Sequence, residues 1–486
     1  MAVFFSTKDG IGNRGGGCLH GKSRHKIKGD NVADERPYWN MAMEPLYGTS
    51  QMVKIQLDRL KDQLARLKAK GGYYARMMKR NKLDPEKLSG FDEFKDKADI
   101  FSKETWKKIV EDCGGDMLKA LDERIACSLD DLIMIATTTG TTGIPSPYAF
   151  TARDLSELWG EYTARGCWRA GIRAHDRVLH CFALSMVIAG LPAAMAYTKV
   201  GATVLPVGAE GKTERILITQ DMWKGTVYLG TPSLLEYLIE QTPKVSGKEV
   251  RDLGFKFLVC GAEPGAGIPE VKAKLETTYD AKIFDIGAGL GFSCNHQEYQ
   301  GMHWLGDDLS YYELVDPDTK QPIPFTNGAR GEMLMTNLVA DGLVTVRESA
   351  GDVHEVLTEP CACGLTGFRY KVVGRADDML KVKGIMIYPS HIKGVINDFV
   401  PRVTGEMRII LDEKPPRVVP PLKIRVEHSA DIPSEQLDAL ANEISDSMSN
   451  RLKIRPRIIW AEPGSLERST YKGRVFQKTY ENEEGK

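Results

Sequence analysis

The segment IATTTGTTGIPSPYAFT, residues 135–151, places five threonines around two glycines directly after an apolar run. The run itself, DLIMIA, predicts a buried strand, and the threonines stand where that strand must turn. Glycines let backbone N–H groups converge on an anion, and threonine hydroxyls add donors. The segment therefore predicts either a phosphate-binding loop or a polar turn that caps a strand, and by itself it favours neither.

The segment is not a Walker-type phosphate loop. Such a loop ends in Gly-Lys-Ser or Gly-Lys-Thr, whereas Gly143 is followed here by Ile144 and Pro145. A further identification has to come from the rest of the chain.

Length and charge limit the number of domains and the kinds of partner. A chain of 486 residues predicts two or three domains. Its 65 basic and 66 acidic residues give no net attraction to nucleic acid or to an anionic membrane, so we expect neither partner.

The apolar stretches and the cysteines indicate a cytoplasmic protein. The longest apolar stretch, FALSMVIAGLPAAMAY, is interrupted by Gly190 and Pro192 and is too short for a membrane span, and MAVFF is too short for a signal peptide. Nine cysteines without a disulfide-framework spacing fit a reducing compartment, where thiols stay free or bind metal.

Hydrophobic periodicity divides the chain into three parts. Residues 1–36 are rich in glycine and charge and predict a mobile extension. From Met52, apolar residues at helical spacing predict an amphipathic helix with Val53, Leu57, Leu60, Leu64 and Leu67 on its buried face. Beyond it, short apolar runs such as GTVYLG and FKFLVCG alternate with helical patterns such as TPSLLEYLIEQ, which predicts an α/β fold with substantially parallel sheet. After Gly374 the pattern changes to strands flanking helices, which predicts a smaller α+β domain.

Further motifs follow the threonine segment in order. They are GAEPGAGIPE (261–270), RESAGDV (347–353), VVGRADDMLKVKGIMIYPSHI (372–392) and PGSLERSTYKGRV (463–475), together with YWN (38–40) and GATVLPVG (201–208). The series resembles the phenylacetate-CoA ligase family of adenylate-forming, acyl-CoA synthetase-like enzymes, over residues 37–475. Each motif alone is weak, but the ordered set is specific, and it favours the phosphate-binding interpretation of the threonine segment.

The resemblance implies both a fold and a reaction. The fold would be α/β, with a large adenylation domain of mixed and parallel sheets at 37–373 and a small α+β lid domain at 374–486. In the reaction, a carboxylate attacks the α-phosphate of MgATP to give an acyl-adenylate and pyrophosphate, and the CoA thiolate then displaces AMP. The resemblance therefore implies an AMP-forming carboxylic acid-CoA ligase of aromatic acid metabolism, with ATP, CoA and Mg²⁺ as its cofactors.

The resemblance also implies roles for individual residues. Asp352 would accept hydrogen bonds from both ribose hydroxyls, although alone it indicates only a surface residue of a turn. Arg375 and Lys472 would be the catalytic cations: Lys472 would contact the reacting α-phosphate and carboxylate, and Arg375 would reach the ribose or a phosphate near the domain junction. Alone, Lys472 indicates only a solvated charge. Asp377 would be the hinge residue. The nucleotide would be bound by Thr138, Thr139, Gly140, Thr141, Thr142, Gly143, Gly261, Ala262, Glu263, Pro264, Asp285, Asp352 and Arg375.

The chain departs from the family pattern at two places. Ile144 stands where the family usually has a lysine, so one cation for the pyrophosphate is missing, and nothing in the sequence shows that Arg153 replaces it. In FDIGAGLGFSCNH, Gly287 stands in place of the adenine-stacking aromatic residue and Gly291 in place of the glutamate that faces Mg²⁺. Adenine stacking and metal coordination must then come from elsewhere, or adenylation is altered or lost. The missing ring also predicts a larger acyl pocket.

Cysteines and histidines near this segment predict a structural zinc site. The expected ligands are His296, His303, Cys361 and Cys363, which form a closed tetrahedral set, while Cys294 is an alternative to His296. Spacing back from His303 favours His296, because some family members have cysteine and histidine at similar places. The simpler alternative is that the cysteines are free thiols in a turn and that His296 is an exposed loop residue.

The acyl substrate is less defined than the reaction. The segment HCFALSMVIAG lies where the family builds its acid pocket, and Phe182, Met186 and Ile188, with Gly287, are the expected lining, although ordinary core is an equal interpretation. The expected partner is a small carboxylic acid that is benzoate-like, arylacetic or alicyclic. Transfer to a carrier-protein thiol or a cofactor hydroxyl instead of CoA, a non-catalytic nucleotide-binding or acyl-CoA-binding role, and a homodimer all stay open.

Overall fold

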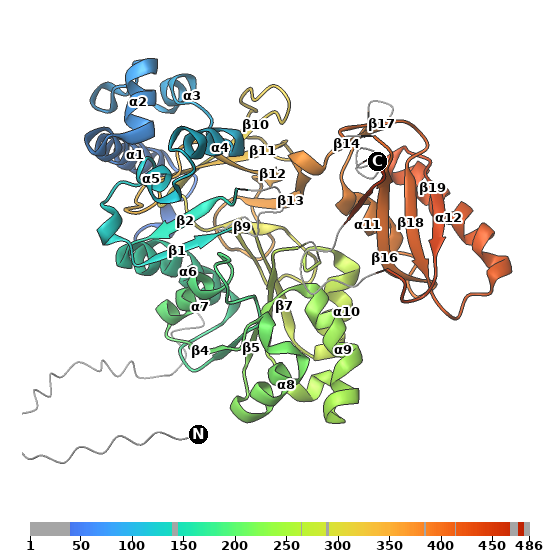
Figure 1. Cartoon of the computed structure of the whole chain (residues 1–486). Helices are drawn as coiled ribbons and strands as arrows, with labels where there is room; N and C mark the ends of the chain where they lie inside the picture. The colour runs from blue at the N-terminus through green and yellow to red at the C-terminus, as the bar shows by residue number, and fades with distance from the viewer. Residues whose placement is uncertain are drawn as a thin grey trace, which may run out of the picture. The chain divides into compact units, whose positions relative to one another are not determined.

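The computed structural model of the chain describes residues 39–138, 144–263, 265–287, 291–382, 385–413, 415–466 and 475–480. The predicted extension, residues 1–36, lies outside this part of the chain. A helical region comes first (Figure 1). Its helices are α1 (Ser50–Lys70), α2 (Gly72–Asn81), α3 (Phe91–Lys97), α4 (Lys103–Asp112) and α5 (Met117–Asp122).

Helix α1 confirms the predicted amphipathic helix, with one correction to its buried face. It begins after Thr49, whose hydroxyl accepts a hydrogen bond from the backbone N–H of Met52. Leu60, Leu64 and Leu67 are buried as predicted, but Val53 is 51% exposed and Met52 is buried instead. The side of the helix that carries Met52 also carries Gln56, whose amide donates to the carbonyl of Asp307 at 2.7 Å.

The predicted strand before the threonines is short and only partly buried. It is β1 (Met134–Thr137), which pairs with β2 (Pro147–Phe150) in a two-stranded antiparallel ribbon. Ala136 is its one buried residue. The prediction of a buried strand was therefore wrong, because this segment does not enter the large sheet, where both faces of a strand are covered.

An eleven-stranded sheet forms the centre of the fold, in the order β10-β11-β12-β13-β9-β8-β7-β6-β5-β3-β4. Its parallel half joins β4, β3, β5, β6 and β7, and the remaining neighbours pair antiparallel. The strands are β3 (Arg177–His180), β4 (Thr203–Pro206), β5 (Val227–Gly230), β6 (Phe257–Gly261), β7 (Lys282–Gly287), β8 (Gly291–Ser293), β9 (Met302–Trp304), β10 (Ser310–Val315), β11 (Arg330–Asn337), β12 (Glu348–Leu357) and β13 (Arg369–Arg375).

Helices cover both faces of the parallel half. They are α6 (Gly160–Ala170), α7 (Leu191–Ala196), α8 (Lys212–Trp223), α9 (Pro232–Ser246) and α10 (Pro269–Tyr279). Alternate residues of β5 pack in different hydrophobic cores, one on each face of the sheet. Tyr228 packs with leucines of α8, α9 and α10. Val227 and Leu229 pack on the other face with Ala164 and Cys167 of α6. This two-sided burial explains why the parallel strands read as continuous apolar runs, and it confirms the predicted α/β fold.

The C-terminal part of the chain is α+β, as predicted, and has small sheets of its own. A three-stranded sheet has the order β15-β14-β17, and a four-stranded sheet has the order β19-β18-β16-β20. Helices α11 and α12 bury Ile396 and Ile444 against Ile409 and Ile424 of the larger of these sheets. The elements are β14 (Leu380–Val382), β15 (Ile385–Ile387), α11 (Pro389–Asn397), β16 (Val403–Leu411), β17 (Arg417–Val418), β18 (Lys423–His428), α12 (Leu437–Leu452), β19 (Arg457–Ala461) and β20 (Phe476–Lys478).

None of the helices in the described ranges combines the length and the apolar character that crossing a bilayer requires.

Candidate active site and metal centre

The predicted ribose-binding carboxylate and the predicted catalytic arginine lie side by side. Asp352 on β12 and Arg375 on β13 are register partners, and Arg375 Nη1 lies 3.0 Å from Asp352 Oδ1. A second guanidinium nitrogen of Arg375 donates to the carbonyl of Ala350 at 3.0 Å. Both side chains keep about a quarter of their surface exposed, at 21% and 28%, so the pair is held in place but still reaches solvent.

The two ends of the threonine loop are held by backbone contacts. Thr138 N–H donates to the carbonyl of Ser146 at 3.0 Å, and Thr137 exchanges backbone hydrogen bonds with Met186 and Ile188. The indole N–H of Trp106 donates to the carbonyl of Pro145 at 3.0 Å. The loop residues Thr139, Gly140, Thr141, Thr142 and Gly143 lie outside the described residues. The start of the loop is therefore attached to the predicted acyl segment through the hydrogen bonds of Thr137 with Met186 and Ile188.

Arg153 is bound elsewhere and does not stand free to replace the missing lysine. It forms an ion pair with Asp341, and its Nη2 also donates to the carbonyl of Val339 at 2.8 Å. Ile144 is 37% exposed.

Residues 261–263 of the GAEP motif lie at the carboxyl end of β6, where the backbone is strained at Ala262. Gly261 is buried at the end of the strand, and Ala262 has φ +69°, a left-handed conformation that is costly for a residue with a side chain. Glu263 accepts a hydrogen bond from Ser233 N–H at 2.8 Å, at the N-terminus of α9, and burial raises the pKa of its carboxyl group. Pro264 lies outside the described residues.

Asp285 lies near the carboxyl end of β7, next to β6 in the sheet, and is partly buried. Tyr299, which no sequence pattern singles out, donates its hydroxyl proton to Asp285 Oδ2 at 2.7 Å. Burial raises the pKa of Asp285 to about 6, and the Tyr299 hydrogen bond opposes that shift. Ala262, Glu263 and Asp285 thus follow or end adjacent parallel strands, the edge at which open α/β sheets bind ligands.

Gly287 and Gly291 face each other in the β7–β8 pair, and the space beside them is filled. A Cβ at Gly287 would lie 3.2 Å from the side chain of Met302, and a Cβ at Gly291 would lie 2.1 Å from Tyr370 Oη. Tyr370, a second residue that the sequence analysis missed, also donates to the Gly287 carbonyl at 2.8 Å. The absence of an aromatic ring at position 287 therefore leaves no open space at the point where a side chain would begin, because Met302 lies there.

The residues predicted to line the acyl pocket differ in exposure. Phe182 is 7% exposed and packs edge-to-face on His180, whereas Met186 is 59% exposed and Ile188 is partly buried. Lys472 lies outside the described residues, and Asp377 lies in a short 3₁₀ turn that follows β13.

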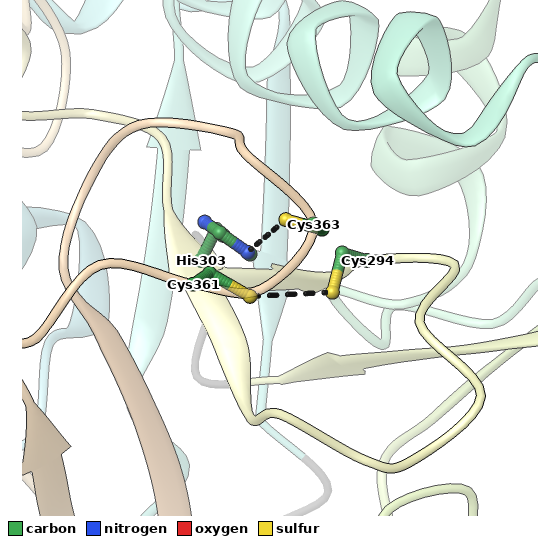
Figure 2. Close-up of side chains that lie close together, drawn as sticks. All are labelled: Cys294, His303, Cys361 and Cys363. Carbon is green, nitrogen blue, oxygen red and sulfur yellow. Dashed lines mark hydrogen bonds between the residues drawn. The ribbon is translucent and has the colours of Figure 1, made fainter.

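A cluster of side chains that could hold a metal ion lies at the other end of β8 (Figure 2). The ligand atoms of Cys294, His303, Cys361 and Cys363 all lie within 4.8 Å of one another, and only Cys363 is more than slightly exposed. Cys294 Sγ lies 3.8 Å from Cys361 Sγ, and Cys363 Sγ lies 3.4 Å from His303 Nε2. Three thiols and one imidazole at this spacing match the Cys₃His set of structural zinc sites.

The surroundings of His303 fit a metal ligand. His303 Nδ1 lies 3.0 Å from the carbonyl of Thr366, which fixes the proton on that nitrogen and leaves Nε2 to face the thiols. Burial opposes protonation of His303, but its hydrogen bonds to Cys361 and Cys363 outweigh burial and raise its pKa, so a metal that binds here must displace that proton. A hydrogen bond from Cys363 lowers the pKa of Cys294, which favours the thiolate form that binds metal.

His296 is not part of this cluster, which corrects the predicted ligand set. Its Nδ1 accepts a hydrogen bond from the Glu298 N–H at 3.2 Å, within the β8–β9 loop. Cys294 takes the fourth place because it directly follows β8 and so keeps a position fixed by the sheet, whereas His296 lies two residues further into the turn.

Two family models match the chain: AMP-binding enzyme over residues 55–286, and AMP-binding enzyme C-terminal domain over residues 384–478. Phenylacetate-coenzyme A ligase of Thermus thermophilus is 26% identical over 438 residues, which is 85% of this chain and 93% of the relative. The enzyme of the same name from Aromatoleum evansii is 25% identical over 341 residues, 68% of this chain and 75% of the relative.

Solved structures of acyl-CoA ligases have the same fold. A 2-hydroxyisobutyryl-CoA ligase in its postadenylation state has a TM-score of 0.82, with 23% identity over 93% of this chain and 94% of the other. A benzoate CoA ligase from Burkholderia xenovorans LB400 has a TM-score of 0.52, with 19% identity over 72% of this chain and 68% of the other. The chain belongs to the AMP-binding, adenylate-forming enzymes and is an AMP-forming CoA ligase that is similar to the phenylacetate-CoA ligases.

Proposed function

We propose that the chain activates an aromatic or similarly hydrophobic carboxylic acid with ATP and transfers the acyl group to CoA, releasing AMP and pyrophosphate. The pair formed by Asp352 and Arg375 carries the proposal. A carboxylate held by a guanidinium is a strong acceptor for a ribose diol, and the arginine beside it brings a positive charge to the phosphate end of the nucleotide.

The proposed first step is attack of the substrate carboxylate on the α-phosphate. Two anions meet in this step, so the cations Arg375 and Lys472 would stabilise the charge that accumulates in the transition state. The threonine loop would hold the β- and γ-phosphates. Mg²⁺ accompanies ATP in such reactions, but Gly291 occupies the position of the expected ligand, so we assign no residue of this chain to the ion.

In the proposed second step, residues 374–486 act as a lid that turns about Asp377 and exchanges the adenylation arrangement for one that admits CoA. The CoA thiolate attacks the acyl carbonyl, and AMP leaves with the electron pair of the broken acyl–phosphate bond. The proposed setting is cytoplasmic, which would keep thiols reduced, and none of the eight described cysteines is in a disulfide.

The acid is proposed to be hydrophobic because Phe182 and Ile188 lie beside His180 and the roots of the threonine loop. Benzoate-like, arylacetic and alicyclic acids all fit this description. The relatives named above are phenylacetate-CoA ligases, which makes arylacetic acids the first to test.

One set of observations favours a second function, the non-catalytic binding of a nucleotide or an acyl-CoA. Ile144, Gly287 and Gly291 each lack a side chain that the family pattern uses, and Arg153 is bound to Asp341. Asp352, Arg375 and Lys472 weigh against it, because a chain without catalysis has no use for the lid lysine.

We also infer that Cys294, His303, Cys361 and Cys363 hold a structural Zn²⁺. Four protein ligands leave no open coordination position, so the metal would cross-link the β8–β9 loop to the β12–β13 loop without taking part in the reaction. Metal analysis of the purified protein tests this inference directly.

Mass spectrometry of the products tests the proposed activity. The full chain is incubated with MgATP, CoA and a panel of arylacetic, benzoate-like and alicyclic acids, beside the Lys472→Ala variant. We expect AMP, pyrophosphate and one acyl-CoA, with a decrease of about a hundredfold or more for Lys472→Ala. Acyl-adenylate without thioester would indicate another acceptor, such as a carrier-protein thiol. ATP binding without turnover of any acid would support the non-catalytic function.

A further inference from the structure

Helix α8 lies beside α9 on one face of the parallel half of the sheet and carries apolar side chains on its solvent side (Figure 1). Ile218 and Met222 are four residues apart, on one side of the helix, and are 58% and 67% exposed. Trp223 at the end of α8 is 58% exposed, and Val245 of α9 is 46% exposed. The opposite side of α8 is buried in the core that it shares with α9 and α10. We call the exposed residues Ile218, Met222, Trp223 and Val245 the α8 patch.

A cavity of about 120 Å³ opens beside the α8 patch, between α8, the end of α9 and the 3₁₀ turn Val250–Leu253. Ile218 and Val245 both line this cavity, so the exposed residues of the two helices form one continuous surface. Single exposed apolar residues are common on monomers, whereas a continuous apolar surface marks an interaction site. The patch contains both a cavity and an exposed, flexible methionine, so a second copy of the same surface can fill it.

The charges beside the patch are complementary to one another across such a contact. Glu214 precedes Ile218 by one helical turn, Lys224 follows the end of α8, and both line the cavity. Lys224 binds Asp221 at 2.8 Å, but 66% of its side chain is exposed. Among the residues that the structure describes, Glu214 forms no hydrogen bond or ion pair. The same edge of the patch therefore has an acidic group at one end and a basic group at the other.

This arrangement favours an antiparallel contact between two α8 helices. The midpoint between Glu214 and Lys224 falls at Thr219, next to Ile218. A two-fold axis there, perpendicular to the helix, brings Glu214 opposite Lys224 of the second copy and repeats the same pair at the other end. A parallel contact would instead bring Glu214 opposite Glu214 and Asp221 opposite Asp221, where like charges repel.

We propose that the α8 patch is the interface of a two-fold symmetric homodimer, in which two α8 helices cross antiparallel near Ile218. Met222 of each copy fills the cavity beside α8 of the other, and Glu214 of each copy pairs with Lys224 of the other. The second copy is the partner that this surface fits, because the surface supplies both halves of its own charge pair and both the side chain and the cavity. The inference does not depend on the proposed reaction.

Sedimentation velocity of the full chain, between about 1 and about 100 μM, tests the proposal. We expect the wild type to dimerise and Met222→Lys to weaken dimerisation about tenfold or more, because the variant places an unpaired charge in the interface. The matched control is Leu118→Lys, which adds the same charge at a residue of α5 that is 56% exposed, and it should leave the dimer unchanged. Circular dichroism checks that each variant is folded. A dimer that Met222→Lys leaves intact would overturn the proposal. A wild type that stays monomeric would also overturn it and would leave the patch to a different protein.

A charge exchange tests the antiparallel arrangement. Glu214→Lys places two lysines against each other at both ends of the interface, and Lys224→Glu places two carboxylates there. We expect each variant alone to dimerise about tenfold more weakly than wild type. An equimolar mixture of the two should recover association, because the heterodimer again has opposite charges at both contacts. Unchanged association of either variant alone, or no recovery in the mixture, would overturn the proposal.

Discussion

The hydroxyl of Tyr370 occupies the space that a side chain at position 291 would need. A Cβ on Gly291 would lie 2.1 Å from Tyr370 Oη and 2.9 Å from the Cβ of Met302, and both neighbours are buried. Tyr370 in turn donates to the carbonyl of Gly287, the partner of Gly291 in the β7–β8 pair. The residue that would be a glutamate in the family pattern is therefore glycine here because a tyrosine from β13 fills its place.

Gly291→Ala should destabilise the fold by about 1–3 kcal/mol, because the methyl group forces Tyr370 and Met302 to move in a close-packed region. Chemical unfolding measures the change. Gly394→Ala is the matched control, since a Cβ there meets no atom within 4 Å and lies in helix α11. It should be neutral or slightly stabilising. Equal effects for both variants would contradict the packing argument.

Cys294→Ser should lose bound zinc and lower the melting temperature, whereas His296→Ala should keep both. The reason is that Cys294, not His296, lies within ligand distance of His303, Cys361 and Cys363. Metal content by mass spectrometry and thermal unfolding with and without a chelator provide the measurements. Retention of zinc in Cys294→Ser together with its loss in His296→Ala would restore the ligand set that the sequence favours.

His354 should make stability fall with acid. The ring is fully buried, and burial lowers its pKa from 6.5 to about 3. Below pH 6.5 His354 is protonated in the unfolded chain, whereas in the native protein the ring stays neutral down to about pH 3. Stability that is present above pH 6.5 is therefore lost as the pH falls, by about 1.4 kcal/mol per pH unit.

His354→Phe removes this titration and keeps a ring to stack on Tyr370, which lies 4.5 Å away between ring centres. Urea unfolding between about pH 6 and about pH 4 should show a shallower loss of stability than in wild type. The variant loses the 2.7 Å hydrogen bond to Tyr312, so the comparison concerns slopes and not absolute values. An unchanged slope in His354→Phe would refute the assignment.

Ile144→Lys should strengthen ATP binding several-fold at low ionic strength. Ile144 is 37% exposed, so a lysine there would not bury its charge, and it would return a cation to the exit of the threonine loop. Titration with MgATP measures the effect, which should weaken as salt is added. Ile133→Lys carries the same added charge at a residue that is 57% exposed and lies before β1. A similar gain in that control would mean that net charge, not position, is responsible.

The sequence alone predicted the α/β order of the elements, and its motifs named Asp352 and Arg375 as candidate site residues. Alternating apolar runs predicted the parallel strands because two covered faces demand continuous apolar residues, as Val227–Gly230 and Phe257–Gly261 show. Ordered motifs located Asp352 and Arg375, which the structure pairs across β12 and β13. Local patterns are sufficient for such features, since each depends on neighbours in sequence or on one strand register.

Only the tertiary structure decided which side chains lie at the positions where this chain departs from the family pattern. Tyr370 reaches Gly287 across 83 residues of chain, and Cys361 reaches Cys294 across 67 residues. Even Tyr299, 14 residues from Asp285, contacts it only because β8 turns the chain back along β7. Contacts of this kind leave no periodicity or spacing in the sequence, because the sheet order that creates them is fixed by the packing of the whole fold and not by any single segment.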